Sequence, residues 1–497
     1  MWPRPSGRSP PARADARIRF APIHCDLSLQ VSARSRLRLL RELPTLLGHA
    51  VTVLAGQLAV MAFGVTDTIV AARHSQEALA ALSIGSAVFI SVYVALMGVL
   101  QALLPIWAEQ RGAGQDGAIG ASVRQSLYLW LAASVLGMAL LLAPGPLLRA
   151  TDVPPELQGE VQRYLGILAW GLPPALLFRI YSTLNQGLGW PQLVTWLQVG
   201  SLALKVPLSI WFTFGGAGLA AQGAAGCAWG TLIVNYALAA LGLGMLRRSA
   251  RYAPLRLWQR LEAPDRAQLL RFVRLGLPAG LAILVEVTSF TLMALFIARQ
   301  GALAAGAHQI ASNLAAVLYM VPLSLGIAAS ARVSFWRGSG HEARAARVAW
   351  LGLGLTVGLA LVLAAVLFLL RQGVASLYTN SAEVAALTAG LLAWVALYHI
   401  ADAVQALCIF VLRSWHVTLA PLLIYGVLLW GLGLTGGYAL AYRGLFGLGP
   451  LHSPVAFWAA SAGALAVVAL AFTALLALVI RLQRQGRHRR AGARATH

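Results

Sequence analysis

The chain of 497 residues contains a single lysine, Lys205, so every other basic residue among its 38 lysines and arginines is arginine. Charged residues make up 11% of the chain, whereas a soluble domain carries about a quarter. The three cysteines, Cys25, Cys227 and Cys408, provide neither a disulfide framework nor a metal-binding spacing. These shortages exclude an ordinary soluble domain and a disulfide-stapled one. They also exclude a Walker A phosphate-binding loop, because Val206 follows the only lysine.

The chain also lacks the short motifs that mark common catalytic sites. It contains no G-x-S-x-G sequence, and "HEARAAR" at His341 lacks the second histidine of a zinc-protease helix. We therefore expect neither an enzyme nor a cofactor. The net charge of +22 is compatible with nucleic-acid binding, but membrane proteins gather arginine on their cytoplasmic loops. For that reason we expect no nucleic-acid partner.

Long apolar segments are what the sequence has in abundance. Hydrophobic residues make up 59% of the chain, and its mean hydropathy is +0.73. A helix needs about 20 apolar residues to cross a bilayer. The sequence therefore predicts an all-α integral membrane protein with twelve transmembrane helices. We expect them at 46–72, 79–107, 122–143, 161–186, 191–214, 220–246, 267–298, 303–331, 346–370, 384–411, 415–441 and 455–480.

Arginine is distributed unevenly between the predicted loops. If the N-terminus is cytoplasmic, the cytoplasmic loops hold most of the arginines outside the N-terminal tail, and the outer loops hold few. Membrane proteins carry this excess of basic residues on cytoplasmic loops. We therefore expect both termini in the cytoplasm.

Short matches between the two halves of the chain indicate an internal repeat. "ALAA" occurs at 78–81 and 302–305, and "RGAG" at 111–114 returns as "RGSG" at 337–340. Each half contains six predicted spans, so both enter the membrane from the same side, as a parallel pseudo-two-fold repeat. We expect two six-helix lobes with a central cleft between them. The expected division is a basic, disordered cytoplasmic tail at 1–40, an N-terminal lobe at 41–246, a cytoplasmic linker at 247–266, a C-terminal lobe at 267–481 and a basic, disordered cytoplasmic tail at 482–497.

Four ionisable residues lie deep within the predicted spans: Asp67, Lys205, Glu286 and Asp402. Each such group costs about 2.5–3.5 kcal/mol on insertion scales, and such groups face the protein interior. One interpretation is a structural role, as an internal ion pair or a hydrogen-bonded carboxylic acid. Because acids stand in both halves of a repeat protein, we favour coupling to ions.

Four stretches carry a family resemblance. They are "GVTDTIVAARHSQEALAALSIGSA" at 64–87, "LGLPAGLAILVEVTSF" at 275–290, "GAHQIASNLAAVLYMVPLSLGIAASARV" at 306–333 and "LYHIADAVQALCIFVLR" at 397–413. They resemble the multidrug and toxic-compound extrusion (MATE) family, in its bacterial NorM-type branch. The resemblance extends over about residues 36–480.

The resemblance implies a twelve-helix, V-shaped, multi-pass protein of the bacterial inner membrane. Such a protein is an antiporter that expels cationic or amphipathic drugs and dyes by alternating access, in exchange for sodium ions or protons. We therefore expect small-molecule drugs or dyes and membrane lipid as partners. We also expect a monomer, and no cofactor other than the coupling ion.

In the C-terminal lobe the resemblance implies a cation site. Glu286 and Asp402 match the two acids that form it, so sodium is the metal ion we consider there. Tyr319 matches an aromatic residue that faces the cation, and Gln309 matches a polar position of the cavity wall. Tyr398 lies one helical turn before Asp402 and shares its face. The alternative for each tyrosine is that it only packs against its neighbours and does not take part in the cation site.

In the N-terminal lobe the resemblance implies a polar cluster around Asp67. The family often has an asparagine in the fifth span and a polar residue four positions later, facing this acid. Lys205 and Ser209 occupy those positions on one helical face, and Thr231 matches a further polar position. An ammonium in lipid becomes tolerable beside a carboxylate, so we expect Lys205 to pair with Asp67 and to replace a bound cation. The alternative is a lysine that snorkels to the membrane surface.

Two other functions remain open from the sequence. A lipid-linked oligosaccharide flippase, or another lipid flippase of the same superfamily, would need arginines in its cavity for pyrophosphate. Arg179 is the residue that keeps this alternative open. A membrane scaffold without transport activity would not need paired acids at mid-depth.

Overall fold

The structure is a computed structural model that describes residues 42–146, 154–216, 218–444 and 449–495. Within these ranges, twelve helical segments are long and apolar enough to cross a membrane. The predicted all-α class and number of spans are therefore confirmed. The N-terminal tail predicted at 1–40, and Cys25 within it, lie outside the described residues.

Six spans form the N-terminal lobe, and the second of them is divided into two helices. The hydroxyl of Ser75 caps the first of these, accepting a hydrogen bond from the Ala78 amide at 3.0 Å. Pro105 lies in the first turn of the second helix. Backbone N–H groups in a first turn have no hydrogen-bond partner within the helix, so a proline there costs no hydrogen bond. The helices are α2 (Glu42–His74), α3 (Gln76–Gln101), α4 (Leu104–Gly112), α5 (Asp116–Leu142), α7 (Pro155–Gly187), α8 (Pro191–Phe214) and α9 (Ala224–Arg248).

A short linker containing the helix η1 (Ala250–Leu255) leads to the C-terminal lobe. Asp265 caps the first span of this lobe, because its side chain accepts hydrogen bonds from the amides of Ala267 and Gln268. The helices are α10 (Arg266–Ala298), α11 (Ala302–Gly338), α12 (Glu342–Tyr378), α13 (Ala382–Arg413), the eleventh span and α16 (Pro454–Ala495).

The C-terminal tail differs from its prediction. Disorder was expected at 482–497, and this is wrong for most of the segment, because α16 continues as a helix to Ala495. The tail is rich in arginine, glutamine and alanine, which are good helix formers. A helix already nucleated in the membrane can extend into such a sequence at little further cost.

The eleventh span departs from regular α-helical geometry. It consists of α14 (Leu419–Tyr425), η2 (Gly426–Thr435), α15 (Gly436–Tyr438) and η3 (Ala439–Arg443), and η2 and η3 are π-helices. Five glycines fall in this span, and glycine holds the α-helical backbone weakly. Apolar composition, which predicts the span, does not distinguish an α-helix from a π-helix.

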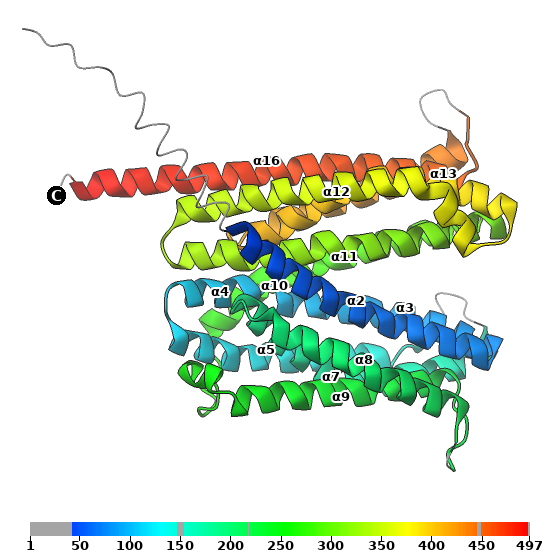
Figure 1. Ribbon diagram of the computed structural model, residues 1–497, viewed down its shortest axis with the longest axis horizontal. Helices are drawn as coiled ribbons and strands as arrows, with labels where there is room; N and C mark the ends of the chain where they lie inside the picture. The colour runs from blue at the N-terminus through cyan, green and yellow to red at the C-terminus, as the bar shows by residue number, and fades with distance from the viewer. Residues whose placement is uncertain (1–41, 147–153, 217, 445–448, 496–497) are drawn as a thin grey trace, which may run out of the picture.

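The two lobes lie next to each other, with their helices along the long axis of the molecule (Figure 1). In this view α5, α7, α8 and α9 lie in the lower half and α12, α13 and α16 in the upper half. The spans α7 and α13 are the most enclosed of their lobes, with 72% and 83% of their apolar windows buried. Large apolar side chains such as Leu369 (77% exposed) and Leu470 (72% exposed) cover the outer surface, which is the surface expected to face lipid.

A symmetric contact between α4 and α11 joins the lobes. A Cβ atom on Gly112 would lie 2.0 Å from the carbonyl oxygen of Phe335, and one on Gly338 would lie 1.8 Å from that of Glu109. The same sequence spacing separates Glu109 from Phe335 and Gly112 from Gly338, so each half of the repeat makes the same contact with the other. The repeated motifs "RGAG" and "RGSG" contain these glycines, whose small size lets the two backbones meet.

Replacing Gly338 by alanine is expected to force α4 and α11 apart. To restore an ordinary contact of about 3.5 Å, the two backbones must separate by about 1–2 Å. Overpacking of this kind costs roughly 1–3 kcal/mol, and thermal unfolding of the purified protein measures it. Gly354→Ala in α12 is the matched control, because a Cβ there meets nothing within 4 Å. Equal stability of the two variants would contradict the packing argument.

Charged contacts also join the lobes at this end of the bundle, where α2 begins; we call it the α2 end. The Nε of Arg332 in α11 lies 2.6 Å from the Oε2 of Glu42 in α2. The Oε2 of Glu109 lies 3.8 Å from Arg337 Nη1 and 3.5 Å from His416 Nε2. Burial, together with the charges of two neighbouring arginines, lowers the pKa of His416 to about 4. At neutral pH, therefore, His416 is uncharged and only the arginines contribute ion pairs to this contact.

The linker between the lobes is attached to α5. The Nε of Arg124 donates to Glu262 Oε2 at 2.8 Å, and its Nη2 donates to the other carboxylate oxygen. This two-pronged pairing lowers the pKa of Glu262 to about 2. The side chain of Gln125 also donates to the carbonyl oxygen of Ala263, at 2.9 Å. These bonds fix the linker to the N-terminal lobe.

Candidate functional site

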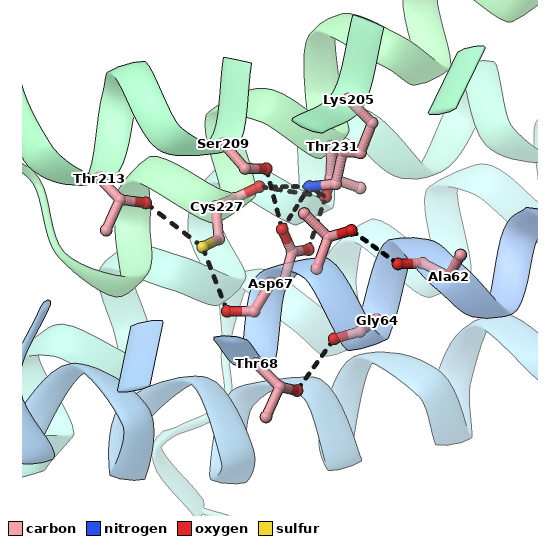
Figure 2. A network of polar contacts seen from close by, with 10 residues as sticks. Ala62, Gly64, Asp67, Thr68, Lys205, Ser209, Thr213, Cys227 and Thr231 are labelled. Carbon is pink, nitrogen blue, oxygen red and sulfur yellow. Dashed lines mark hydrogen bonds and ion pairs between the residues drawn. The ribbon is translucent and has the colours of Figure 1, made fainter. Parts of the chain in front are cut away.

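A network of polar side chains occupies the interior of the N-terminal lobe (Figure 2). Asp67 comes from α2, Lys205 and Ser209 from α8, and Cys227 and Thr231 from α9. The two residues of α8 lie one helical turn apart, as do the two of α9, so each pair points the same way. Lys205 is fully buried and Asp67 is 7% exposed.

Three acceptors surround the Lys205 ammonium. Its Nζ lies 2.6 Å from Asp67 Oδ1, 2.7 Å from Thr231 Oγ1 and 3.1 Å from the carbonyl oxygen of Cys227. A lysine ammonium carries three N–H donors, so every donor has an acceptor. Removing an ion pair from water is costly unless the geometry is good and the remaining polar groups are hydrogen-bonded. This site meets both conditions.

The carboxylate of Asp67 is also well supplied with donors. The Ser209 hydroxyl donates to Oδ1 at 2.9 Å, and the Thr231 hydroxyl lies 3.4 Å from Oδ2. Gly230 lets α8 and α9 approach closely, because a Cβ there would lie 2.9 Å from the Ser209 hydroxyl oxygen. The structure thus brings together the four residues predicted for this lobe, in one neutral unit with one cation and one carboxylate.

In the C-terminal lobe, Glu286 lies beside a small cavity. The cavity has a volume of about 20 Å³, and a water-sized particle needs about 10–15 Å³. Its polar lining comes from Glu286 and Ser289 of α10, Tyr398 of α13 and Ser461 of α16. The Tyr398 ring packs edge-on against Trp458, with ring centroids 5.7 Å apart. Glu286 and Tyr398 therefore share one space, which is large enough for a single water molecule or small ion.

Asp402 is 3% exposed on α13. Its Oδ1 accepts a hydrogen bond from Gln405 Nε2 at 2.9 Å, and Tyr425 donates in turn to the Gln405 oxygen. The charge of Asp402 acts on Glu286, and the charges of both acids act on Tyr319 of α11. Two carboxylates so placed repel each other when both are ionised. A cation, or a proton on one of them, removes this repulsion.

Sequence reasoning missed Arg413, the last residue of α13. It is 2% exposed, its Cζ lies 4.4 Å from the centre of the Phe410 ring, and its charge acts on Glu286. Its Nε and Nη1 have no hydrogen-bond partner among the described residues. The predicted span ends at residue 411, which leaves Arg413 outside it. The signal that could have revealed it is that the apolar stretch 397–413 continues through Val411 and Leu412 directly to Arg413.

Gln309, predicted for the cavity wall, belongs to the eighth span, α11. It is exposed on α11, and its Nε2 donates to the side chain of Asn313 at 3.1 Å. It does not line the cavity beside Glu286. Within the described ranges, no group of three or more His, Cys, Asp or Glu side chains is placed to hold a metal ion. Any sodium ion at Glu286 and Asp402 would therefore depend on these two carboxylates and on neutral oxygen atoms.

Comparison with known proteins gives a family match in both lobes. A model of the MatE family matches residues 53–211 and again residues 278–439. The first segment lies in the N-terminal lobe and the second in the C-terminal lobe. This double match confirms the internal repeat.

Curated relatives match over most of their length. The chain is 38% identical over 435 residues to "Probable multidrug resistance protein NorM" of Aromatoleum aromaticum, covering 87% of this chain and 93% of the relative. It is 33% identical over 411 residues to "Multidrug resistance protein PmpM" of Pseudomonas aeruginosa, covering 82% and 86%.

Solved structures show the same fold at lower identity. The eukaryotic MATE transporter AtDTX14 matches with a TM-score of 0.79 at 18% identity, covering 91% of this chain and 99% of that one. A structure described as MATE in the straight conformation matches with a TM-score of 0.80 at 16% identity, covering 89% and 96%. The family match in both lobes, the relatives and the shared fold together show that this chain is a multi-pass membrane protein belonging to the MatE family.

Proposed function

We propose that this protein is a secondary active multidrug efflux transporter. It exports cationic or amphipathic organic compounds, such as drugs and dyes, in exchange for sodium ions or protons. Relatives at 31–38% identity are named multidrug resistance proteins, and this supports the substrate class. In alternating access the two lobes would rock about their contacts, exposing the site between them first to one side of the membrane and then to the other.

The placement of two acids inside one lobe, Asp402 buried and Glu286 half-buried beside the small cavity, is the observation that carries the coupling proposal. Ionisable groups inside a membrane protein mark ion and proton paths. When both acids are ionised, the nearby Arg413 compensates one of the two negative charges. One unit of negative charge is left, so the site is suited to one sodium ion or one proton at a time.

The N-terminal lobe then has a different role. Lys205 already neutralises Asp67 and occupies three oxygen acceptors, so no charge remains there to attract sodium. We therefore assign ion coupling to Glu286 and Asp402. The Lys205–Asp67 pair takes the place of a bound cation.

We further propose that the protein lies as a monomer in the inner membrane of a bacterial cell, with both termini in the cytoplasm. The excess of arginine on the loops of that side supports the orientation. The α2 end then faces the cytoplasm. Because α4 and α11 touch at this end, the arrangement described here corresponds to a transporter closed toward the cytoplasm.

Ethidium transport in everted membrane vesicles tests this function. We expect an imposed sodium gradient or an imposed proton gradient, applied separately, to drive ethidium across vesicles that contain the protein. Vesicles with the Glu286→Gln variant are the control and should stay at background. Transport that ignores both gradients would contradict ion-coupled antiport.

The flippase alternative depends on Arg179. This residue is 6% exposed within α7 and does not line the cavity beside Glu286. It also does not line the larger cavity between the lobes, described next. Arg179 therefore gives no support to a flippase function.

A further inference from the structure

A second, larger cavity lies between the lobes at the α2 end. Its volume is about 360 Å³, which falls within the range of about 300–1,000 Å³ typical of small-molecule sites. Residues of α2, the end of α4, the end of α7, the start of α8 and α11 line it. Its rim includes the exposed Pro44, Thr45 and Gly48, so the cavity opens at the surface of the bundle.

Two arginines from different lobes line this cavity. Arg111 belongs to α4 and Arg332 to α11, and their Cζ atoms lie 5.8 Å and 5.2 Å from the centre of the same ring, that of Phe335. Glu42 pairs with Arg332. Within the described part of the chain, no carboxylate pairs with Arg111. The cavity therefore has more positive than negative charge on its walls.

Neutral groups suited to an anion surround these charges. His49 of α2 lines the cavity, and its Nε2 is buried without a hydrogen-bond partner in the described residues. Gln192, in the first turn of α8, adds a side-chain amide. The N-terminal end of a helix carries partial positive charge and favours anions. A buried nitrogen without a partner costs stability unless a ligand or water reaches it.

We propose that this cavity binds the phosphate group of an anionic ligand, with Arg111 and Arg332 as its charged contacts and His49 as a neutral one. Arginine recognises phosphate through paired, parallel hydrogen bonds. The cavity lies at the ends of membrane spans, and basic pockets between transmembrane helices at the cytoplasmic side bind anionic lipid headgroups. A phospholipid headgroup is one source of the phosphate, and free inorganic phosphate is the other.

A phosphate held there would contact both lobes at once. Arg111 belongs to the N-terminal lobe and Arg332 to the C-terminal lobe. The bound anion therefore adds to the contacts that hold the α2 end closed. This role is separate from drug transport and does not depend on which ion drives it.

Binding of phosphatidylglycerol to the purified full-length protein tests the proposal. In neutral detergent, native mass spectrometry should show saturable retention of phosphatidylglycerol over phosphatidylcholine. Arg111→Gln should raise the dissociation constant about tenfold or more, as expected for the loss of a charged hydrogen bond. Arg248→Gln is the matched control, because this arginine is exposed at the end of α9, outside the cavity. It should leave binding unchanged.

Glu42→Gln provides a second, opposite test. It removes the carboxylate that competes for Arg332, so phosphatidylglycerol should bind several-fold more tightly than to the unaltered protein. A purely structural role of these residues predicts no gain. Unchanged or weaker binding by Glu42→Gln would therefore count against the proposal.

Competition with inorganic phosphate separates the two sources. If phosphate displaces phosphatidylglycerol from the unaltered protein but binds weakly to Arg111→Gln, the soluble anion is a ligand of the same site. If millimolar phosphate leaves phosphatidylglycerol in place, the headgroup is the ligand. Equal retention of the two lipids, or equal binding by Arg111→Gln and Arg248→Gln, would overturn the proposal.

Discussion

Asp402→Asn and Glu286→Gln are each expected to abolish gradient-driven ethidium transport while the protein still inserts into the membrane. Each change keeps the shape of the side chain and removes one negative charge. With Arg413 nearby, a site that keeps one acid is already neutral and has no charge left to attract an ion. The loss of a charged ligand should weaken ion affinity by about 10–100-fold, so transport falls to background at ordinary gradients.

Everted vesicles measure this loss, and immunoblotting of the same membranes measures insertion. Glu383→Gln is the matched control, because it removes a carboxylate from the same helix at an exposed position in the first turn of α13. It should transport normally. Normal transport by either interior variant would show that coupling does not need both acids.

Lys205→Ala should destabilise the protein strongly. It removes the one cation that contacts Asp67 among the described residues, and the carboxylate is then buried with two hydroxyl groups as its partners. Breaking a buried ion pair by removing one partner costs about 3–5 kcal/mol. Thermal unfolding of the detergent-solubilised protein should show this loss, or the variant should fail to accumulate in the membrane.

The double variant Lys205→Ala with Asp67→Asn should recover most of the stability, because the remaining amide carries no charge. If coupling belongs to the C-terminal lobe, the double variant should also keep its response to the ion gradient. A double variant as unstable as Lys205→Ala would mean that the lysine stabilises the lobe through packing. Normal stability and transport of Lys205→Ala alone would mean that the ion pair has no important role.

The sequence was sufficient for the architecture because membrane spans follow from composition and length. The twelve apolar segments, the two-lobe repeat and the deep charges could all be found without coordinates. The position of Lys205 opposite Asp67 was also within reach, since matching the spans to a family sets which helical faces meet. The exchange of a bound ion for this lysine stays a prediction, because it concerns function.

Other features could not be predicted, for physical reasons. Arg413 lies two residues beyond a predicted span end, and composition locates such ends only to within several residues. The cavity at the α2 end gathers His49, Arg111 and Arg332 from three helices in two lobes. No local pattern links them, because their proximity results from how the lobes pack. The "RGAG" and "RGSG" motifs were found as a repeat, yet their packing role became clear only from the contact between α4 and α11.

The presence of one lysine gives this protein a built-in chemical reporter. Amine-reactive reagents attack a free, neutral amine, and Lys205 is fully buried with its three hydrogens donated. In the arrangement described here, acylation should therefore be confined to the amine at the N-terminus. Labelling of Lys205 during turnover would show that the N-terminal lobe opens far enough to release Asp67. Cleavage of the unfolded chain after lysine yields two fragments. An acylated lysine is protected from that cleavage. The fraction of uncut chain on a gel therefore measures the fraction of molecules in which the N-terminal lobe has opened.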